Sequence, residues 1–232
     1  MRVLKFGGSS LADADRFLRA ANIIANSAKQ GEVSVVLSAP GKTTNKLVEV
    51  IDSALRHEPV ESHLSNLEQS LRGLFNDIHS ILPNVEASGF ENQIDISFQQ
   101  LRQFVDGIHL LGMCPDNVNA RIISKGERIS VQLMKAVLES YEQQTNLIDP
   151  VEFLLAKGAP LEAMVDVERS TENFAKNPLP LGRINLMPGF TAGDLSRINL
   201  TICRRIERCR DRTCTLTHRT QETNDITIEQ EA

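Results

Sequence analysis

The chain has 232 residues, a formal net charge of -5 and 41% hydrophobic residues. This composition is typical of a globular protein with a real core, and no apolar run approaches the roughly 20 residues of a membrane span. An acidic chain gives no electrostatic reason to expect binding to nucleic acid. The N-terminus begins at once with an apolar strand and has no signal-peptide pattern, so we expect a cytoplasmic protein with no membrane association.

The first ten residues predict a buried strand, at 2–6, that runs into a glycine turn. Lys5 places a mobile positive charge at the end of this strand. Gly7 and Gly8 allow the backbone to approach a ligand closely, and a following helix would direct its free N–H groups toward the same place. These features favour a phosphate site. An ordinary strand-to-helix turn explains the same residues equally well.

Strands and helices alternate along the first two thirds of the chain. The predicted strands are residues 2–6, 33–38, 146–149 and 183–190. The predicted helices are residues 13–28, 44–56, 62–82, 91–111, 116–124 and 127–140. The two longest helices predict a packed hairpin with a structural role. The alternation predicts an α/β fold, a three-layer sandwich with a mainly parallel sheet, whose ligands lie beyond the carboxyl ends of the strands.

The loop after the second predicted strand contains Gly41, Lys42, Thr43 and Thr44. It suggests a P-loop, but that motif needs a glycine where this chain has Val36 inside a strand, so we reject it. Capping of the following helix is the more common role of such threonines.

Four cysteines are unevenly placed. Cys114 stands alone, while Cys203, Cys209 and Cys214 lie close to His218. Their spacing matches no common zinc site, so we expect no metal and unpaired thiols.

Six segments of the chain carry a resemblance to a known family. They are K-F-G-G-S at 5–9, S-A-P-G-K-T-T-N at 38–45, L-L-G-M-C-P-D at 110–116, K-G-E-R at 125–128, I-D-P-V-E at 148–152 and P-G-F-T-A-G at 188–193. In this order they resemble the N-terminal lobe of aspartokinase, and most nearly the kinase part of bifunctional aspartokinase-homoserine dehydrogenases. The resemblance covers about residues 1–193 and implies the amino acid kinase fold.

The resemblance implies an activity. Aspartokinases transfer the γ-phosphoryl group of MgATP, the co-substrate, to the side-chain carboxylate of L-aspartate, the first step toward lysine, threonine and methionine. L-aspartate and ATP are therefore the expected partners. A homo-oligomer and a complementing chain both remain open.

The resemblance assigns roles to the first loop. Lys5 resembles the catalytic lysine that neutralises charge on the transferring phosphoryl group, and Gly7 and Gly8 present N–H donors to the phosphate. Ser9 stands where the family usually has threonine, and its hydroxyl is expected to bind the substrate.

Two further residues are expected to bind aspartate by the same resemblance. Thr44 helps to hold the substrate, and Glu127 pairs with its ammonium group. Without the resemblance, Glu127 would be interpreted as a first-turn acid that the helix dipole favours. Lys125 replaces an arginine of the usual R-G-E pattern, which keeps the charge but loses a bidentate fork.

The resemblance ends after Gly193. Residues 194–232 contain no glycine, no lysine, seven arginines and three of the four cysteines. Their seven acids balance the arginines, which favours a solvated segment over a phosphate or nucleic-acid contact. We expect an N-terminal lobe at 1–193, a divergent and poorly ordered tail at 194–232, and no C-terminal nucleotide-binding half. The predicted function is aspartate kinase. The alternatives are a non-catalytic aspartate-binding or interaction fragment and a degenerate relic.

Overall fold

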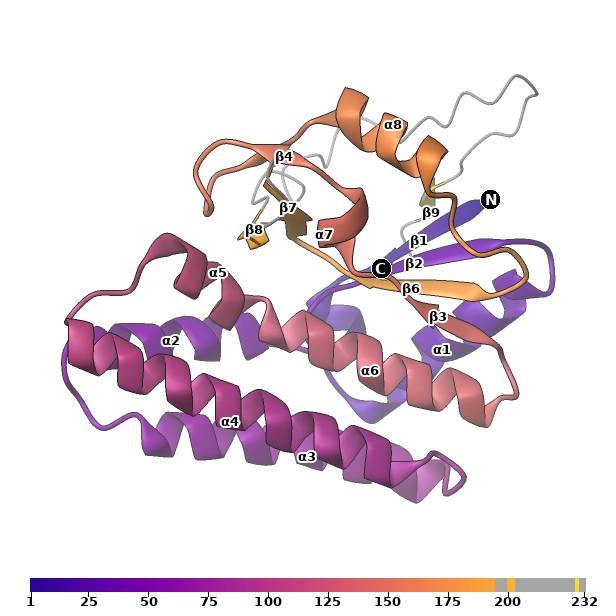
Figure 1. The fold of residues 1–232 in the computed structure, drawn as a ribbon. Helices are drawn as coiled ribbons and strands as arrows, with labels where there is room; N and C mark the ends of the chain where they lie inside the picture. The colour runs from indigo at the N-terminus through magenta and orange to yellow at the C-terminus, as the bar shows by residue number, and fades with distance from the viewer. Residues whose placement is uncertain (195–199, 203–227, 230–232) are drawn as a thin grey trace.

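The protein folds around a parallel β-sheet (Figure 1). This computed structural model describes residues 1–194, 200–202 and 228–229. The sheet has the strand order β3-β6-β2-β1-β9, and every neighbouring pair runs parallel. Its strands are β1 (Arg2–Phe6), β2 (Val33–Leu37), β3 (Thr145–Leu147), β6 (Ile184–Pro188) and β9 (Ile228–Glu229). The predicted α/β class and mainly parallel sheet are confirmed.

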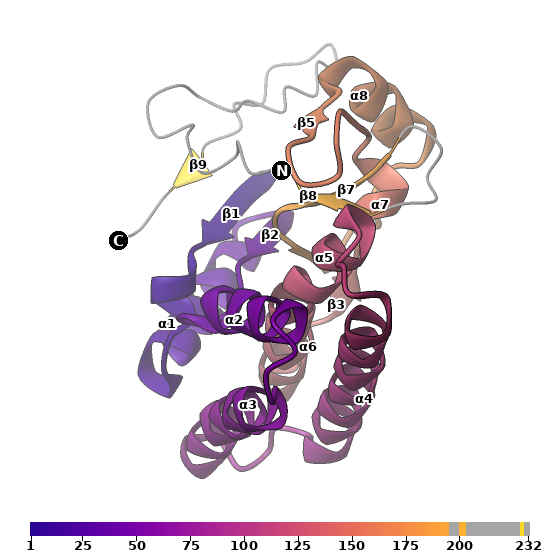
Figure 2. The same ribbon diagram turned by 90° about the vertical axis from the view of Figure 1, so that its left-hand side faces the viewer.

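Helices lie on both sides of the sheet (Figures 1 and 2). On one side α1 and α6 contact the strands, and α3 and α4 lie side by side farther out. On the other side are α7 and α8. The helices are α1 (Ala14–Ala28), α2 (Thr43–Leu55), α3 (Glu61–Ile81), α4 (Ala87–Leu111), α5 (Asp116–Ile123), α6 (Lys125–Ser140), α7 (Pro150–Phe153) and α8 (Val167–Lys176).

The two faces of β1 differ, as the alternation of a strand requires. Leu4 and Phe6 are buried in the main core, where Val35 and Leu37 stand beside them in register. Lys5 lies between the two core residues and therefore faces the opposite side of the sheet, away from α1 and α6. The strand thus fixes the core and presents a cation on its other face.

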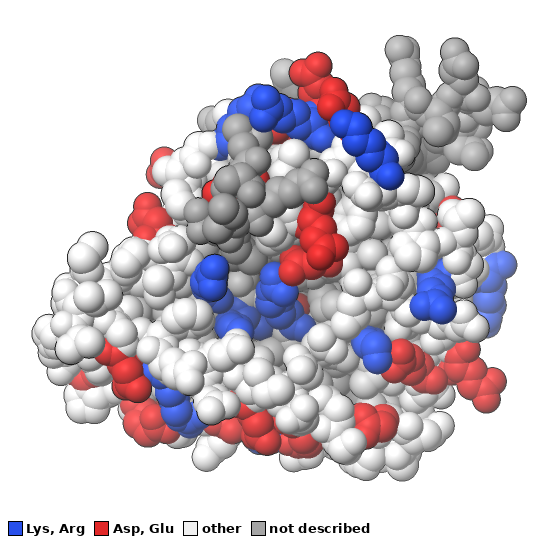
Figure 3. All heavy atoms as spheres, viewed as in Figure 1, with Lys and Arg blue, Asp and Glu red and all other residues white. Residues whose placement is uncertain are grey.

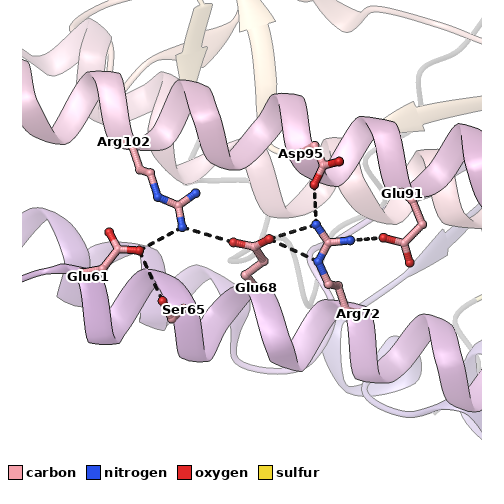
Figure 4. A network of polar contacts seen from close by, with 7 residues as sticks. All are labelled: Glu61, Ser65, Glu68, Arg72, Glu91, Asp95 and Arg102. Carbon is pink, nitrogen blue, oxygen red and sulfur yellow. Dashed lines mark hydrogen bonds and ion pairs between the residues drawn. The ribbon is translucent and has the colours of Figure 1, made fainter.

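The predicted hairpin of two long helices is α3 and α4, joined on its surface by a charged network (Figure 4). Arg72 of α3 contacts Glu68 of the same helix at 2.9 Å. It also contacts Glu91 and Asp95 of α4, the latter at 2.5 Å. Arg102 of α4 reaches back to Glu68 at 3.3 Å. The network joins the facing sides of the two helices, and the packed hairpin that the sequence predicts is confirmed.

The strand predicted at 146–149 ends earlier in the structure, at Leu147. The Asp149 carboxylate accepts a hydrogen bond from the N–H of Val151 at 3.2 Å, and Pro150 is the first residue of α7. Asp149 is therefore a helix cap, which the strand prediction overlooked.

A short 3₁₀ helix, η1 (Gly8–Leu11), separates the glycine turn from α1. The first residue of α1 is Ala14, and the Asp13 carboxylate caps it by accepting from the N–H of Arg16 at 2.9 Å. The helix that follows the glycine turn directly is therefore this short one, and the helix predicted at 13–28 begins separately, within one residue of its expected start. At the start of α1, the N–H groups of Arg16 and Phe17 donate hydrogen bonds to Asp13.

Several small elements were not predicted. They are the hairpin of β4 (Ala156–Lys157) and β5 (Met164–Val165), the helix α8, and the pair of β7 (Thr191–Gly193) and β8 (Leu200–Ile202). Of the tail expected to be poorly ordered, residues 194, 200–202 and 228–229 are described, and Cys203, Cys209, Cys214 and His218, whose spacing matches no common zinc site, lie outside the described residues. No helix within the described part of the chain is long and apolar enough to cross a membrane.

Candidate functional site

Gly8 lies against the loop that follows β2. Its carbonyl accepts a hydrogen bond from the N–H of Gly41 at 2.8 Å. A Cβ on Gly8 would stand 2.8 Å from the carbonyl oxygen of Ala39 and 3.0 Å from that of Gly41. Because a real Cβ does not come so close to backbone, only glycine fits here. The loops after β1 and β2 are thus in direct contact.

The start of α6 packs on the same loop. A Cβ on Gly126 would lie 2.7 Å from both Ala39 Cβ and Thr43 Cγ2. One turn further along α6, the Ser130 hydroxyl donates to the carbonyl of Ser38 at 2.7 Å. The K-G-E segment is therefore fixed against the S-A-P-G-K-T segment by a glycine contact and a partly buried hydrogen bond.

Glu127 lies in the first turn of α6, and only 3% of it is exposed. Its Oε1 is 3.9 Å from the position that a Cβ on Gly189 would occupy. Gly189 in turn donates its N–H to the carbonyl of Leu37 at 2.9 Å. The interpretation of Glu127 as a first-turn acid favoured by the helix dipole describes its place in α6 but does not account for the burial of its carboxylate near the ends of β2 and β6.

These contacts define a loop cluster, by which we mean Gly8, Ala39–Thr43, Gly126–Glu127 and Gly189. It joins segments from four separate parts of the sequence at the carboxyl ends of β1, β2 and β6. In open parallel sheets this is where ligands bind. The convergence of loops that the sequence predicts is thus present in the fold.

Lys5 is half-buried at the end of β1. No hydrogen bond or ion pair engages its ammonium group among the described residues. Two residues later, Gly7 has extended backbone, and a Cβ there would meet nothing within 4 Å. Gly7 and Gly8 therefore differ: Gly8 is packed against protein, whereas open space lies in front of Gly7.

The two hydroxyl residues of the predicted substrate site lie at the edge of the loop cluster. Ser9 is exposed in η1, and its carbonyl accepts from Arg16 Nη1 at 3.1 Å. Thr44 is half-buried in the first turn of α2. Within the described part of the chain, no hydrogen bond joins either hydroxyl to Lys5 or Glu127.

Sequence reasoning overlooked the contacts of Ser130 and of the pair Arg128–Asp149, and it gave Thr43 the wrong role. Thr43 is buried and donates its hydroxyl to the carbonyl of Pro40 at 2.7 Å, while the cap position of α2 belongs to Lys42. Capping by Thr43 is therefore wrong. No local pattern marks the contacts of Ser130 and Arg128, because each joins segments that are distant in the sequence. No group of three metal-binding side chains gathers within the described residues.

Comparison with known proteins identifies the family. Residues 1–204 match the amino acid kinase family. The chain belongs to this family. It is 37% identical over 195 residues to a bifunctional aspartokinase/homoserine dehydrogenase of Buchnera aphidicola, covering 84% of this chain and 24% of that protein. It is 36% identical to the enzyme of the same description from Haemophilus influenzae, with the same coverage of both chains. The chain thus spans about a quarter of the length of these curated relatives.

Solved structures of this family share the fold. Aspartokinase III of Escherichia coli, in complex with aspartate and ADP, superposes with a TM-score of 0.72 at 22% identity, over 87% of this chain and 43% of that chain. The aspartate kinase of Clostridium acetobutylicum has a TM-score of 0.63 at 20% identity, over 88% of this chain and 42% of its own. The parallel sheet and its helices are therefore the amino acid kinase fold.

Proposed function

We propose that the chain is the acceptor-binding lobe of an aspartokinase-type phosphotransferase, formed by residues 1–193, with residues 194–232 as a divergent tail. The observation that carries this proposal is the burial of Glu127 beside Gly189 within the loop cluster. Membership of the amino acid kinase family and similarity to bifunctional aspartokinase/homoserine dehydrogenases support this reaction class.

The proposed reaction is a phosphoryl transfer. A side-chain carboxylate oxygen of L-aspartate attacks the γ-phosphorus of MgATP, the new P–O bond forms, and the bond between the γ-phosphorus and the bridging oxygen breaks. The products are aspartyl phosphate and ADP. Such a transfer depends on positioning and charge stabilisation more than on covalent chemistry by the protein.

The acceptor side of the site would consist of Glu127, Thr44 and Ser9. A buried carboxylate is suited to pair with the ammonium group of aspartate, because the low-polarity surroundings strengthen the attraction. The hydroxyls of Thr44 and Ser9 would bind the substrate carboxylates. The burial of Glu127 thus selects an amino acid over a simple dicarboxylate.

The phosphoryl side would consist of Lys5, Gly7 and Gly8. Lys5 has no protein partner among the described residues and can follow the charge that moves during transfer. The open space in front of Gly7 allows a phosphate to approach the backbone N–H groups.

The test is an assay that traps aspartyl phosphate with hydroxylamine, on the purified chain with MgATP and L-aspartate. Product that is lost in Lys5→Ala and retained in Lys29→Ala, which changes an exposed lysine that follows α1, would support a working phosphoryl-transfer site in this chain. Calorimetric binding of aspartate without product would identify an aspartate-binding lobe that does not turn over. If the folded chain neither formed product nor bound aspartate, the proposal would be contradicted.

A further inference from the structure

Three basic side chains gather in a hollow outside the loop cluster (Figure 3). Arg121 of α5 and Lys125 and Arg128 of α6 line a pocket of about 480 Å³. Gln100 and Phe104 of α4 form its other wall. A pocket of this size accommodates a small organic anion.

The sequence spacing explains why the three cations share one face. Arg121 and Lys125 are four residues apart across the junction of α5 and α6, and Lys125 and Arg128 are three apart on α6. Glu127 is not among the residues that line the pocket, and its carboxylate lies beside Gly189 instead. The pocket is thus distinct from the proposed aspartate site, although both use the start of α6.

The charges in this pocket are only partly balanced. The Asp149 carboxylate accepts hydrogen bonds from Arg128 at 3.2 Å to each oxygen. Lys125 donates to the side-chain oxygen of Gln100, which is neutral. Within the described residues Arg121 makes no hydrogen bond and no ion pair through its guanidinium. Three positive charges therefore face one carboxylate.

The pKa of Lys125 is affected by its position in this pocket. Its pKa is lowered, first because burial disfavours the charged ammonium group and then because Arg128 and Arg121 repel it. An anion bound between the three cations would remove this repulsion and stabilise the charged form of Lys125. The geometry and the charge thus favour a ligand with more than one negative charge.

We propose that this pocket binds a small phosphate ester as a second, separate anion site. Two guanidinium groups and an ammonium group match the oxygens of a phosphate dianion, since arginine binds them in a fork and lysine as a point charge. The three cations and Asp149 together carry a net charge of about +2, which a phosphate dianion would neutralise. Phe104 and Val151, which also line the pocket, give the carbon part of an ester an apolar surface.

The test is calorimetric titration with inorganic phosphate and with glycerol 3-phosphate at constant ionic strength. We expect both to bind the intact chain, glycerol 3-phosphate more tightly, and Arg121→Gln to weaken binding about tenfold, the effect of one charge-assisted hydrogen bond. Arg19→Gln, which changes an exposed arginine of α1, is the matched control and should leave the affinity unchanged.

Two further measurements separate this site from the others. Lys5→Ala should retain phosphate binding, because Lys5 lies on β1, faces away from α6 and does not line this pocket. Binding that is lost in Lys5→Ala and kept in Arg121→Gln would overturn the proposal, because the phosphate would then occupy the proposed catalytic site. Succinate that binds as tightly as glycerol 3-phosphate would overturn the phosphate assignment.

Discussion

The loop cluster and the α3–α4 hairpin hold their polar groups in opposite ways. In the loop cluster, Glu127 and Thr43 are buried, and Gly126 leaves no room for one more carbon atom. In the hairpin, the charged groups lie at the surface, and Arg72 shares three carboxylates. The packing of the loop cluster leaves no space for an added atom, whereas the hairpin contains several ion pairs that can substitute for one another. Their response to mutation should therefore differ in kind.

The largest effect should come from the charge of Glu127. In Glu127→Gln the shape is kept, but the charge of the proposed partner of the substrate ammonium is lost, and for a buried charge pair such a loss costs about 2–5 kcal/mol. Aspartate affinity measured by calorimetry should fall at least about thirtyfold. The matched change in the hairpin, Glu61→Gln, should leave the affinity unchanged. Equal affinity in the two variants would exclude Glu127 from the aspartate site.

The next effect distinguishes two helix glycines. Gly126→Ala should destabilise the fold by about 1–3 kcal/mol, because the new methyl group overlaps Ala39 and Thr43. Gly73→Ala in α3 meets no atom within 4 Å and should stabilise by up to about 1 kcal/mol, the helix propensity of alanine over glycine. Urea unfolding of both variants measures the signs. Stabilisation of the fold by Gly126→Ala as well would show that the residues around Gly126 can shift to accommodate the added methyl group.

A smaller effect should follow from loss of the hairpin arginine. Arg72→Met removes the common partner of Glu68, Glu91 and Asp95 but keeps an apolar stem over the seam. Ion pairs that stay partly open to solvent contribute little individually, so we expect a loss of about 1 kcal/mol in the free energy of unfolding. High salt should reduce this difference further. If Arg72→Met lost more stability than Gly126→Ala, the hairpin and not the loop cluster would be the region more sensitive to a single substitution.

The smallest effect concerns acid. A hydrogen bond from Arg102 lowers the pKa of Glu61, and the Ser88 hydroxyl followed by the Gly89 N–H lowers that of Glu86, the cap of α4. Unfolded glutamate titrates near about pH 4.3. This stabilisation is therefore fully present above that pH and is lost as the pH falls through the lower folded values.

Melting temperatures from about pH 7 to about pH 3 test this expectation. Arg102→Met should melt lower at neutral pH and lose less on acidification than the unchanged chain. A parallel fall in both proteins would place the acid-sensitive groups elsewhere.

Much of the fold follows from local patterns in the sequence. The alternation around Leu4 and Phe6 predicts β1 correctly, and the helical spacing of apolar residues predicts α1 to α6 within a few residues. Errors lie at boundaries. Asp149 and Asp13 are both helix caps, and a cap competes with the strand or turn that the neighbouring residues favour. The helix α8 has few apolar residues, so its periodic signal is weak.

The candidate site is less accessible to sequence reasoning alone. The sequence shows glycine at positions 8 and 126, but it does not show why glycine is needed there. Each of these glycines contacts the loop at Ala39–Thr43, which is distant in the sequence. The same limit applies to Ser130, whose partner is the carbonyl of Ser38. Local patterns identify which residues can carry chemistry. Long-range packing decides which of them meet.

The position of β6 has a consequence for the order of events in folding. β6 lies between β2 and β3, and it pairs Asn185 with Ser34 from the opposite end of the lobe. Pairing across so long a stretch of chain is slow, because the loop must close before the strands gain contacts. During synthesis, β1 and β2 leave the ribosome long before β6. Gly189 can therefore reach Glu127 only after nearly the whole lobe has emerged, and the loop cluster is completed last.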